Sequence, residues 1–256
     1  MTDLAMALGE RVVTLPLRID GPAQSLRAAF AHVPGAAFGG AQAEVEVEAL
    51  LHPREMAVLA GLRAPRRRRS YLLGRCAAKA ALSELLGGVE RARIEIVSGV
   101  LDQPVVRGGG PEPVDVSITH SDARACALAF PAAMPMGLDV EELDPERAAV
   151  MESQLAQAER AMVRAVTHSD LLGFTLVWTA KEALSKALRC GLTVPFDVLA
   201  LDRIEVGPWG FTGRFRNFGQ YAFHVWTRPG WVLSLVLPLH CHLRTDLGAA
   251  LAGDDA

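Results

Sequence analysis

Residues 200–237 alternate between short apolar segments and turn sequences, and this pattern limits the fold more than any other feature of the chain. The turn sequences are Gly207-Pro208, Asn217-Phe218-Gly219 and Arg228-Pro229-Gly230. Short turns of this composition connect neighbouring antiparallel strands. The pattern therefore predicts a four-stranded meander, at residues 200–206, 211–215, 221–227 and 231–237.

The rest of the chain mixes helices with further short strands, which is typical of an α+β protein. Helical patterns cover residues 53–61, 67–86, 152–166 and 172–188, and Gly87-Gly88 closes the second of them. Further strands are predicted at residues 12–19, 94–97, 114–119, 125–130 and 136–140. A proline-rich break at residues 131–135 separates two parts of similar length and content. We expect an N-terminal half of residues 1–133 and a C-terminal half of residues 134–256.

Composition narrows the functional classes. Half of the 256 residues are hydrophobic and only 6% are aromatic, so we expect a sizeable core and no stacking platform for nucleic acid. The net charge is −3, so an anionic ligand must be bound by local basic patches. The four cysteines are scattered, the first residues lack a basic leader, and no apolar run is long enough to cross a membrane. These features predict a cytoplasmic protein without a membrane or nucleic-acid partner.

The segment Gly137-Leu138-Asp139-Val140-Glu141-Glu142 places acidic residues on a predicted strand. Because strand side chains alternate, Asp139 and Glu141 project from one face while Leu138 and Val140 enter the core. Two neighbouring carboxylates repel each other unless a cation lies between them, and oxygen ligands of this kind suit Mg²⁺. The spacing alone favours a solvated, acidic strand end over a metal site.

The segment 178–186, Trp-Thr-Ala-Lys-Glu-Ala-Leu-Ser-Lys, lies on a predicted helix. Trp178, Glu182 and Lys186 recur every four residues and form one stripe, with an apolar face behind it. This polar stripe faces away from the helix's own core, where it can line a cleft. Alternatively, Glu182 and Lys186 form an ordinary surface ion pair.

Two further segments carry polar groups suited to phosphate. The predicted strand 114–119 ends in Thr119-His120-Ser121, whose donors could hold a phosphate or cap a structural turn. The run Arg66-Arg67-Arg68-Arg69 begins the predicted helix 67–86, and Arg68, Arg75 and Lys79 fall near one face of that helix. An arginine run is also common on solvated surfaces, and no nucleic-acid-binding motif accompanies this one.

In this order, the four segments resemble those of the 4′-phosphopantetheinyl transferases, in particular the larger monomeric type that serves siderophore, nonribosomal-peptide and polyketide synthases. The similarity covers most of the chain. It rests on Gly74-Arg75 with the residues that follow, on 117–121, on 137–141 and on 178–186.

The resemblance implies two similar α+β halves related by a pseudo-twofold axis, with coenzyme A in the cleft between them. It implies that Asp139, Glu141 and Glu182 share a Mg²⁺ at the pyrophosphate, and that Glu182 takes the proton from a serine of an acyl or peptidyl carrier protein. Adenosine 3′,5′-bisphosphate would be released. Lys186 would contact a phosphate near the transferred group and would be the second catalytic residue.

The remaining roles implied by the resemblance concern the binding of coenzyme A. Thr119 and His120 would hold the nucleotide end, Arg67 and Arg75 are candidates for the 3′-phosphate or the adenine side, and Lys181 would lie beside the coenzyme. Which of the two arginines contacts the 3′-phosphate stays open.

One position departs from the family pattern. Gln103 precedes Pro104 where many relatives have a lysine or arginine, so one phosphate contact is either missing or supplied by Arg107. The metal and base positions all match. A coenzyme A-binding protein without turnover is the alternative function, and a nucleic-acid-binding protein built around the arginine run is disfavoured by the isoelectric point near 6.2.

Overall fold

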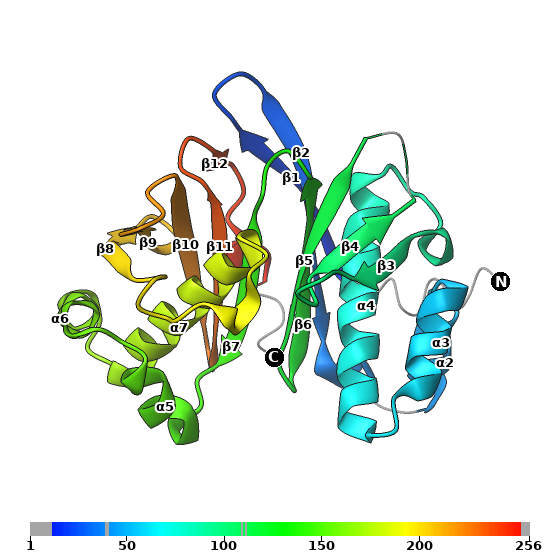
Figure 1. Ribbon diagram of the computed structural model, residues 1–256, viewed down its shortest axis with the longest axis horizontal. Helices are drawn as coiled ribbons and strands as arrows, with labels where there is room; N and C mark the ends of the chain where they lie inside the picture. Colours follow the sequence, from blue (N-terminus) through cyan, green and yellow to red (C-terminus); the bar gives the residue numbers. More distant parts are fainter. Residues whose placement is uncertain (1–11, 39–40, 109, 111, 252–256) are drawn as a thin grey trace. The chain divides into compact units, whose positions relative to one another are not determined.

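The computed structural model describes residues 12–38, 41–108, 110 and 112–251. These residues form two compact units, each built from a sheet and helices (Figure 1). Unit 1 runs to Ile19 and continues from Ser25 to Ala133, while unit 2 contains Asp20–Gln24 and resumes at Met134. The α+β class predicted from the sequence is confirmed.

In unit 1, strands β1, β2, β6 and β5 lie side by side in that order, and β3 pairs with β4 in a separate hairpin. The long helix α4 packs across β2, β6 and β5, and its buried face of leucine, alanine and Cys76 fills the core. The elements are β1 (Val13–Asp20), β2 (Ser25–Pro34), α2 (Ala41–Glu48), α3 (Pro53–Gly61), α4 (Pro65–Leu85), β3 (Glu95–Ser98), β4 (Pro104–Arg107), β5 (Val114–His120) and β6 (Arg124–Pro131).

Both helices that border the recess of unit 1, described below, begin at a proline, whose fixed φ suits the first turn. Helix α3 has a capping box, in which the Glu55 carboxylate accepts from the backbone N–H of His52. Helix α4 ends where Gly87 and Gly88 take positive φ values of 74° and 90°. Those are conformations that favour glycine, so the stop signal identified in the sequence is confirmed.

In unit 2, the sheet order is β7-β11-β10-β9-β8, so the predicted meander forms its last four strands and β7 joins beside β11. Helix α7 packs against β7, β11 and β10. The elements are β7 (Gly137–Glu142), α5 (Ala148–Ser153), α6 (Gln157–Val166), α7 (Asp170–Ala187), β8 (Leu201–Gly207), β9 (Gly210–Phe215), β10 (Tyr221–Arg228), β11 (Trp231–Pro238), β12 (His242–Leu243) and α8 (Leu247–Ala250).

The structure corrects the single helix predicted at residues 152–166, which is two helices, α5 and α6. The break follows from Leu155, which is buried, and from Glu159, whose carboxylate accepts from the backbone N–H of Ala156 at 2.8 Å and so starts a new helix. Among the described helices, none combines the length and apolar character that a membrane-spanning segment requires.

Candidate functional site

Strand β7 presents its acidic residues to helix α7. Asp139 lies opposite Ser234 of β11 and Glu141 lies opposite Val232, so both carboxylates are on the sheet face that α7 covers. Gly137, on the same face, packs so closely that a Cβ there would lie 1.9 Å from the carbonyl oxygen of Ala183. The glycine therefore permits the strand and the helix to approach each other at the start of β7.

The polar stripe predicted on α7 lies beside these carboxylates. The ammonium Nζ of Lys186 is 2.6 Å from Oδ1 of Asp139, whose side chain is only 7% exposed. A strand and a helix that are distant in sequence are thus joined by an ion pair in a largely desolvated place, where charge interactions are strong.

Glu141 is held by an arginine that the sequence analysis did not identify. Arg147, at the end of the short 3-10 helix Pro145–Arg147, forms an ion pair with Glu141. The indole N–H of Trp178 donates at 3.1 Å to Oε1 of Glu141, which also accepts from Nη2 of Arg147 at 3.2 Å. The Trp178 ring stacks on Phe196 with centroids 4.8 Å apart. Burial raises the pKa of Glu141 and Asp139 adds to the rise, while Arg147 and Trp178 oppose it. No local motif marks Arg147 in the sequence.

Among the carboxyl groups of the site, Glu182 has the largest shift in pKa. Burial first, and then repulsion from Asp139 and Glu141, raises its pKa from the ordinary 4.5 to about 7, against the opposing effect of Lys186. A carboxyl group with a pKa near neutrality can both accept and release a proton at physiological pH.

The three carboxylates influence one another, but they do not form a closed metal cluster. Within the described ranges, no group of three or more His, Cys, Asp or Glu side chains is arranged to hold a metal ion. Two of the carboxylates are paired with side-chain cations of the protein: Asp139 with Lys186, and Glu141 with Arg147. The donor set, carboxylate oxygens that repel each other, fits a hard divalent cation in kind. Binding such an ion requires that these cations give way.

Lys181 has a different place from the one expected. Its side chain is fully buried, and its ammonium lies 2.8 Å from Glu159 of α6 and 3.2 Å from the carbonyl oxygen of Gln154. Burial lowers the pKa of Lys181, and the Glu159 carboxylate opposes that effect. This lysine ties α6 to α7, so we do not retain it as a coenzyme-binding residue.

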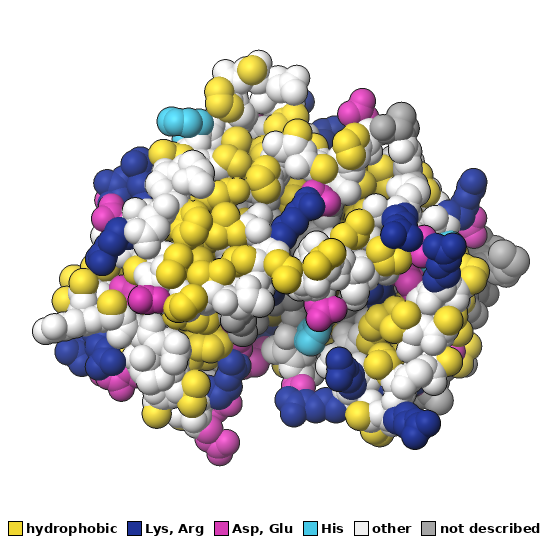
Figure 2. Space-filling model, viewed as in Figure 1, with side chains coloured by type: hydrophobic (Ala, Val, Ile, Leu, Met, Phe, Trp, Pro, Cys, Tyr) yellow, Lys and Arg dark blue, Asp and Glu magenta, His cyan; other side chains and the backbone are white. Residues whose placement is uncertain are grey.

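Unit 1 contains a recess of about 820 Å³ between α3, α4, the β3–β4 hairpin and the end of β5. Its wall combines apolar side chains with cations, a composition suited to a base and to phosphate. Lys and Arg side chains gather over this helical part of the surface (Figure 2). The lining includes Val58, Leu62, Arg66, Arg67, Tyr71, Arg75, Val97, Asp102, Pro104, Ile118 and His120.

The four arginines at residues 66–69 do not all point the same way. Arg66 and Arg67 line the recess, and Arg66 also makes a two-pronged contact with Asp122. Arg68 instead pairs with Glu48 of α2, and Arg69 donates to the carbonyl oxygen of Gly35 at 2.8 Å. Half of the run therefore faces the recess and half fixes α4 to its neighbours.

Thr119 and His120 are consecutive residues of β5, so their side chains point to opposite faces of the sheet. His120 lines the recess, where its ring approaches Gly74 of α4. Thr119 is 4% exposed and points to the other face of the sheet. Only His120 is brought together with Arg67 and Arg75.

The departure at Gln103 has a structural explanation. Its side-chain oxygen accepts from the backbone N–H of Leu101 at 2.8 Å, so Gln103 closes the turn between β3 and β4 instead of lining the recess. Arg107 lies at the far end of β4, opposite Glu95, and is not part of the recess lining either. The arginines of the recess come from α4, and its histidine comes from β5.

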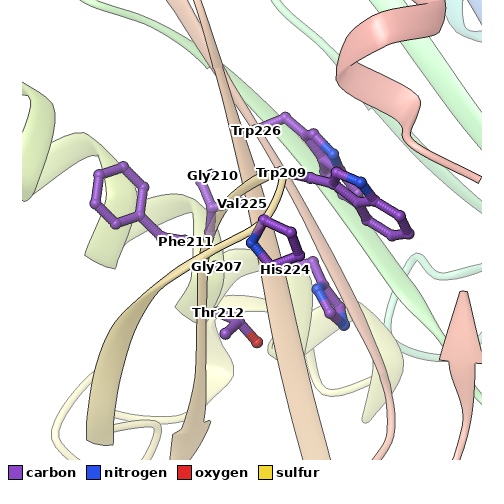
Figure 3. A pocket seen from close by; sticks show the side chains of 9 residues that line it. Gly207, Trp209, Gly210, Phe211, Thr212, His224, Val225 and Trp226 are labelled. Atoms are coloured by element: carbon purple, nitrogen blue, oxygen red, sulfur yellow. The ribbon is translucent and has the colours of Figure 1, made fainter.

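A smaller cavity of about 70 Å³ lies beside the β8–β9 turn in unit 2 (Figure 3). Trp209, His224 and Trp226 lie on one side of the strands, while Phe211 points the other way and packs on the core beneath α7. Burial, followed by the nearby His242, lowers the pKa of His224. The lining contains no carboxylate, lysine or arginine, so we do not consider it a phosphate or metal site.

A known family model matches a segment of unit 2. Residues 135–236 match the sequence model of the 4′-phosphopantetheinyl transferase superfamily, and this segment contains β7 and α7. No curated protein matches the chain. A holo-(acyl-carrier-protein) synthase from Bacillus anthracis, solved in complex with CoA (3′,5′-ADP), is 22% identical over 46% of this chain and 96% of its own, with a TM-score of 0.35. Holo-[acyl-carrier-protein] synthase of Thermotoga maritima is 20% identical over 52% of this chain and 72% of its own, with a TM-score of 0.32.

Proposed function

We propose that this chain, which belongs to the 4′-phosphopantetheinyl transferase superfamily, moves the phosphopantetheine group of coenzyme A onto a serine of a carrier protein. One observation supports this proposal more strongly than the others. The segment that matches the family places Asp139, Glu141 and Glu182 around one another on β7 and α7, with Lys186 beside them.

The two sets of residues suit different parts of the coenzyme. The recess of unit 1 offers apolar side chains for the base and Arg67, Arg75 and His120 for phosphate. The carboxylates of unit 2 would hold Mg²⁺, which when bound neutralises charge on the pyrophosphate oxygens. Lys186 supplies a further cation for that group once it leaves Asp139.

Glu182 acts as the general base in this proposal. The serine oxygen forms a bond to the phosphorus of the phosphopantetheine group, and the bond from that phosphorus to the leaving adenosine 3′,5′-bisphosphate breaks. The serine proton passes to the Glu182 carboxylate, which lies close enough to Asp139 and Glu141 to feel their charge. Such a base contributes roughly 10²–10⁴-fold to the rate.

The finer assignments rest on the resemblance noted from the sequence. We propose that the protein works as a monomer in the cytoplasm, on carrier domains of siderophore, nonribosomal-peptide or polyketide synthases.

Intact-mass analysis of apo carrier proteins after incubation with coenzyme A and Mg²⁺ tests the activity. We expect one carrier serine to gain the mass of a phosphopantetheine group, and the gain to disappear when a chelator is added. If coenzyme A binds and no carrier of any of the three kinds is modified, the protein is a coenzyme A-binding protein and the transferase assignment is wrong.

A further inference from the structure

Glu55 is a buried carboxylate in unit 1 that no motif in the sequence identifies. Its side chain is 2% exposed. One oxygen accepts from the backbone N–H of His52 at 2.8 Å and lies 2.7 Å from the ammonium of Lys79. The other oxygen accepts from the backbone N–H of Ile96 at 3.1 Å and lies 3.3 Å from Nε of Arg75. Both oxygens are thus fully engaged, as a buried charge requires.

The group of Glu55, Lys79 and Arg75 carries one positive charge in excess. Lys79 is fully buried and also donates to the carbonyl oxygens of Arg91 and Ile94, so it cannot reach a ligand. This corrects the expectation that Lys79 belongs to a phosphate-binding face. Because Lys79 balances the charge of Glu55, the excess charge stays on Arg75, the one member of the three that lines the recess.

Arg75 is held on three sides. Glu55 lies beside Nε, Nη2 donates to the carbonyl oxygen of Ile96 at 3.3 Å, and the guanidinium carbon lies 4.7 Å from the centre of the Tyr71 ring. The side chain is only 14% exposed. A guanidinium has five N–H donors, so these contacts leave donors over for a ligand in the recess. A guanidinium fixed in this way binds phosphate with little loss of side-chain freedom.

We propose that Glu55 is a positioning residue that fixes Arg75 in the recess, with Lys79 as its counter-ion, so that the site selects a nucleotide bearing a phosphate monoester on its ribose. The inference rests on the proposed function, because coenzyme A has such a phosphate and 3′-dephospho-coenzyme A lacks it. A fixed guanidinium at this site should therefore bind coenzyme A more tightly than 3′-dephospho-coenzyme A.

The experiment measures binding of coenzyme A and of 3′-dephospho-coenzyme A by calorimetry, with the full chain. We expect the wild type to prefer coenzyme A. Glu55→Gln keeps the size of the side chain and one acceptor oxygen but removes the charge. It should lower the preference by about tenfold or more, the usual cost of losing a charged hydrogen-bond partner, with affinity for 3′-dephospho-coenzyme A little changed.

Glu55→Gln leaves the buried ammonium of Lys79 without its carboxylate and risks unfolding. The double variant Glu55→Gln, Lys79→Met removes both buried charges and should keep the fold while losing the preference. Arg75→Gln should lose the preference as well, and adding Glu55→Gln to it should change nothing further, because both changes act on one contact.

Glu48→Gln is the matched control. Glu48 of α2 pairs with Arg68, which lies on α4 like Arg75 but does not line the recess. This variant should therefore keep the wild-type preference for coenzyme A. A wild type without preference, an Arg75→Gln variant that retains it, or a folded double variant that retains it would each overturn the inference. Any of these results with carrier modification intact removes the role of Glu55 alone, whereas loss of both coenzyme binding and modification removes the proposed function.

Discussion

Glu182 links the stability of the protein to pH. Its pKa is raised from 4.5 to about 7 in the folded chain, so between these values the unfolded state binds fewer protons than the folded state. The free energy of unfolding therefore falls as pH rises through this window. The cause is burial next to Asp139 and Glu141, which makes the ionised form unfavourable.

Glu182→Gln should remove this dependence. In a metal-free buffer, we expect the variant to melt at about the wild-type temperature at pH 4.5 and a few degrees above it at pH 8. Thermal melts followed by circular dichroism across this range check the sign. A wild type that gains stability relative to the variant as pH rises from 4.5 to 7 would contradict the assignment of the pKa.

The burial and the ion-pair partners of two lysines could not be predicted from the local sequence. The helix position of Lys79 suggests a ligand-facing role, and the family resemblance implies one for Lys181, yet both lysines are fully buried. Their partners, Glu55 and Glu159, lie more than twenty residues away in the chain. Helical periodicity shows which residues share a face, but it does not show which distant carboxylate that face meets. The acidic pair on β7 was identifiable because its spacing is local.

At the scale of elements, the close contact between β7 and α7 builds the carboxylate site. Gly137→Ala would place a Cβ 1.9 Å from the carbonyl oxygen of Ala183 and 2.7 Å from the amide nitrogen of Ala187, both backbone atoms. Strand and helix would have to separate. We expect destabilisation by about 3 kcal/mol.

Gly61→Ala is the control for that substitution. Gly61 ends α3 with nothing within 4 Å of an added Cβ, so alanine there should be neutral or slightly stabilising. Urea unfolding of both variants makes the comparison. Equal stability of Gly137→Ala and the wild type would show that β7 and α7 are not in the tight contact described.

Element boundaries were predictable where the chain carries its own stop signals. The ends of α4 and the meander strands follow from Gly87-Gly88 and from the turn sequences. Strand β2 was missed because Ser25–Pro34 is a nearly continuous apolar run without alternation, a consequence of burial on both faces. The division between α5 and α6 was missed because Glu159 creates it without any glycine or proline.

At the scale of the whole molecule, a net charge of −3 leaves no long-range field that would attract an acidic partner. We expect the proposed carrier protein to dock through an acidic helix, so its association must rely on local basic surface. Such attraction weakens with salt, because the Debye length shrinks from about 10 Å at 0.1 M to about 3 Å at 1 M.

We therefore expect the KM for the carrier to rise as ionic strength rises, with kcat little changed. Steady-state kinetics at several salt concentrations measure this. A carrier whose acidic helix residues are neutralised serves as the control, and its KM should be high and insensitive to salt. A KM for the native carrier that does not vary with salt would argue for docking through apolar contacts alone.

Single-turnover transfer with the Glu182→Gln variant tests the proposal that Glu182 takes the proton from the carrier serine. We expect that coenzyme A still binds in calorimetry while the rate of transfer falls by roughly 10²–10⁴-fold, and that additional Mg²⁺ does not restore this rate. Asp139→Ala, measured alongside, should regain part of its rate with excess Mg²⁺, because it lacks a metal ligand and not the base. Near-normal transfer by Glu182→Gln would contradict the claim.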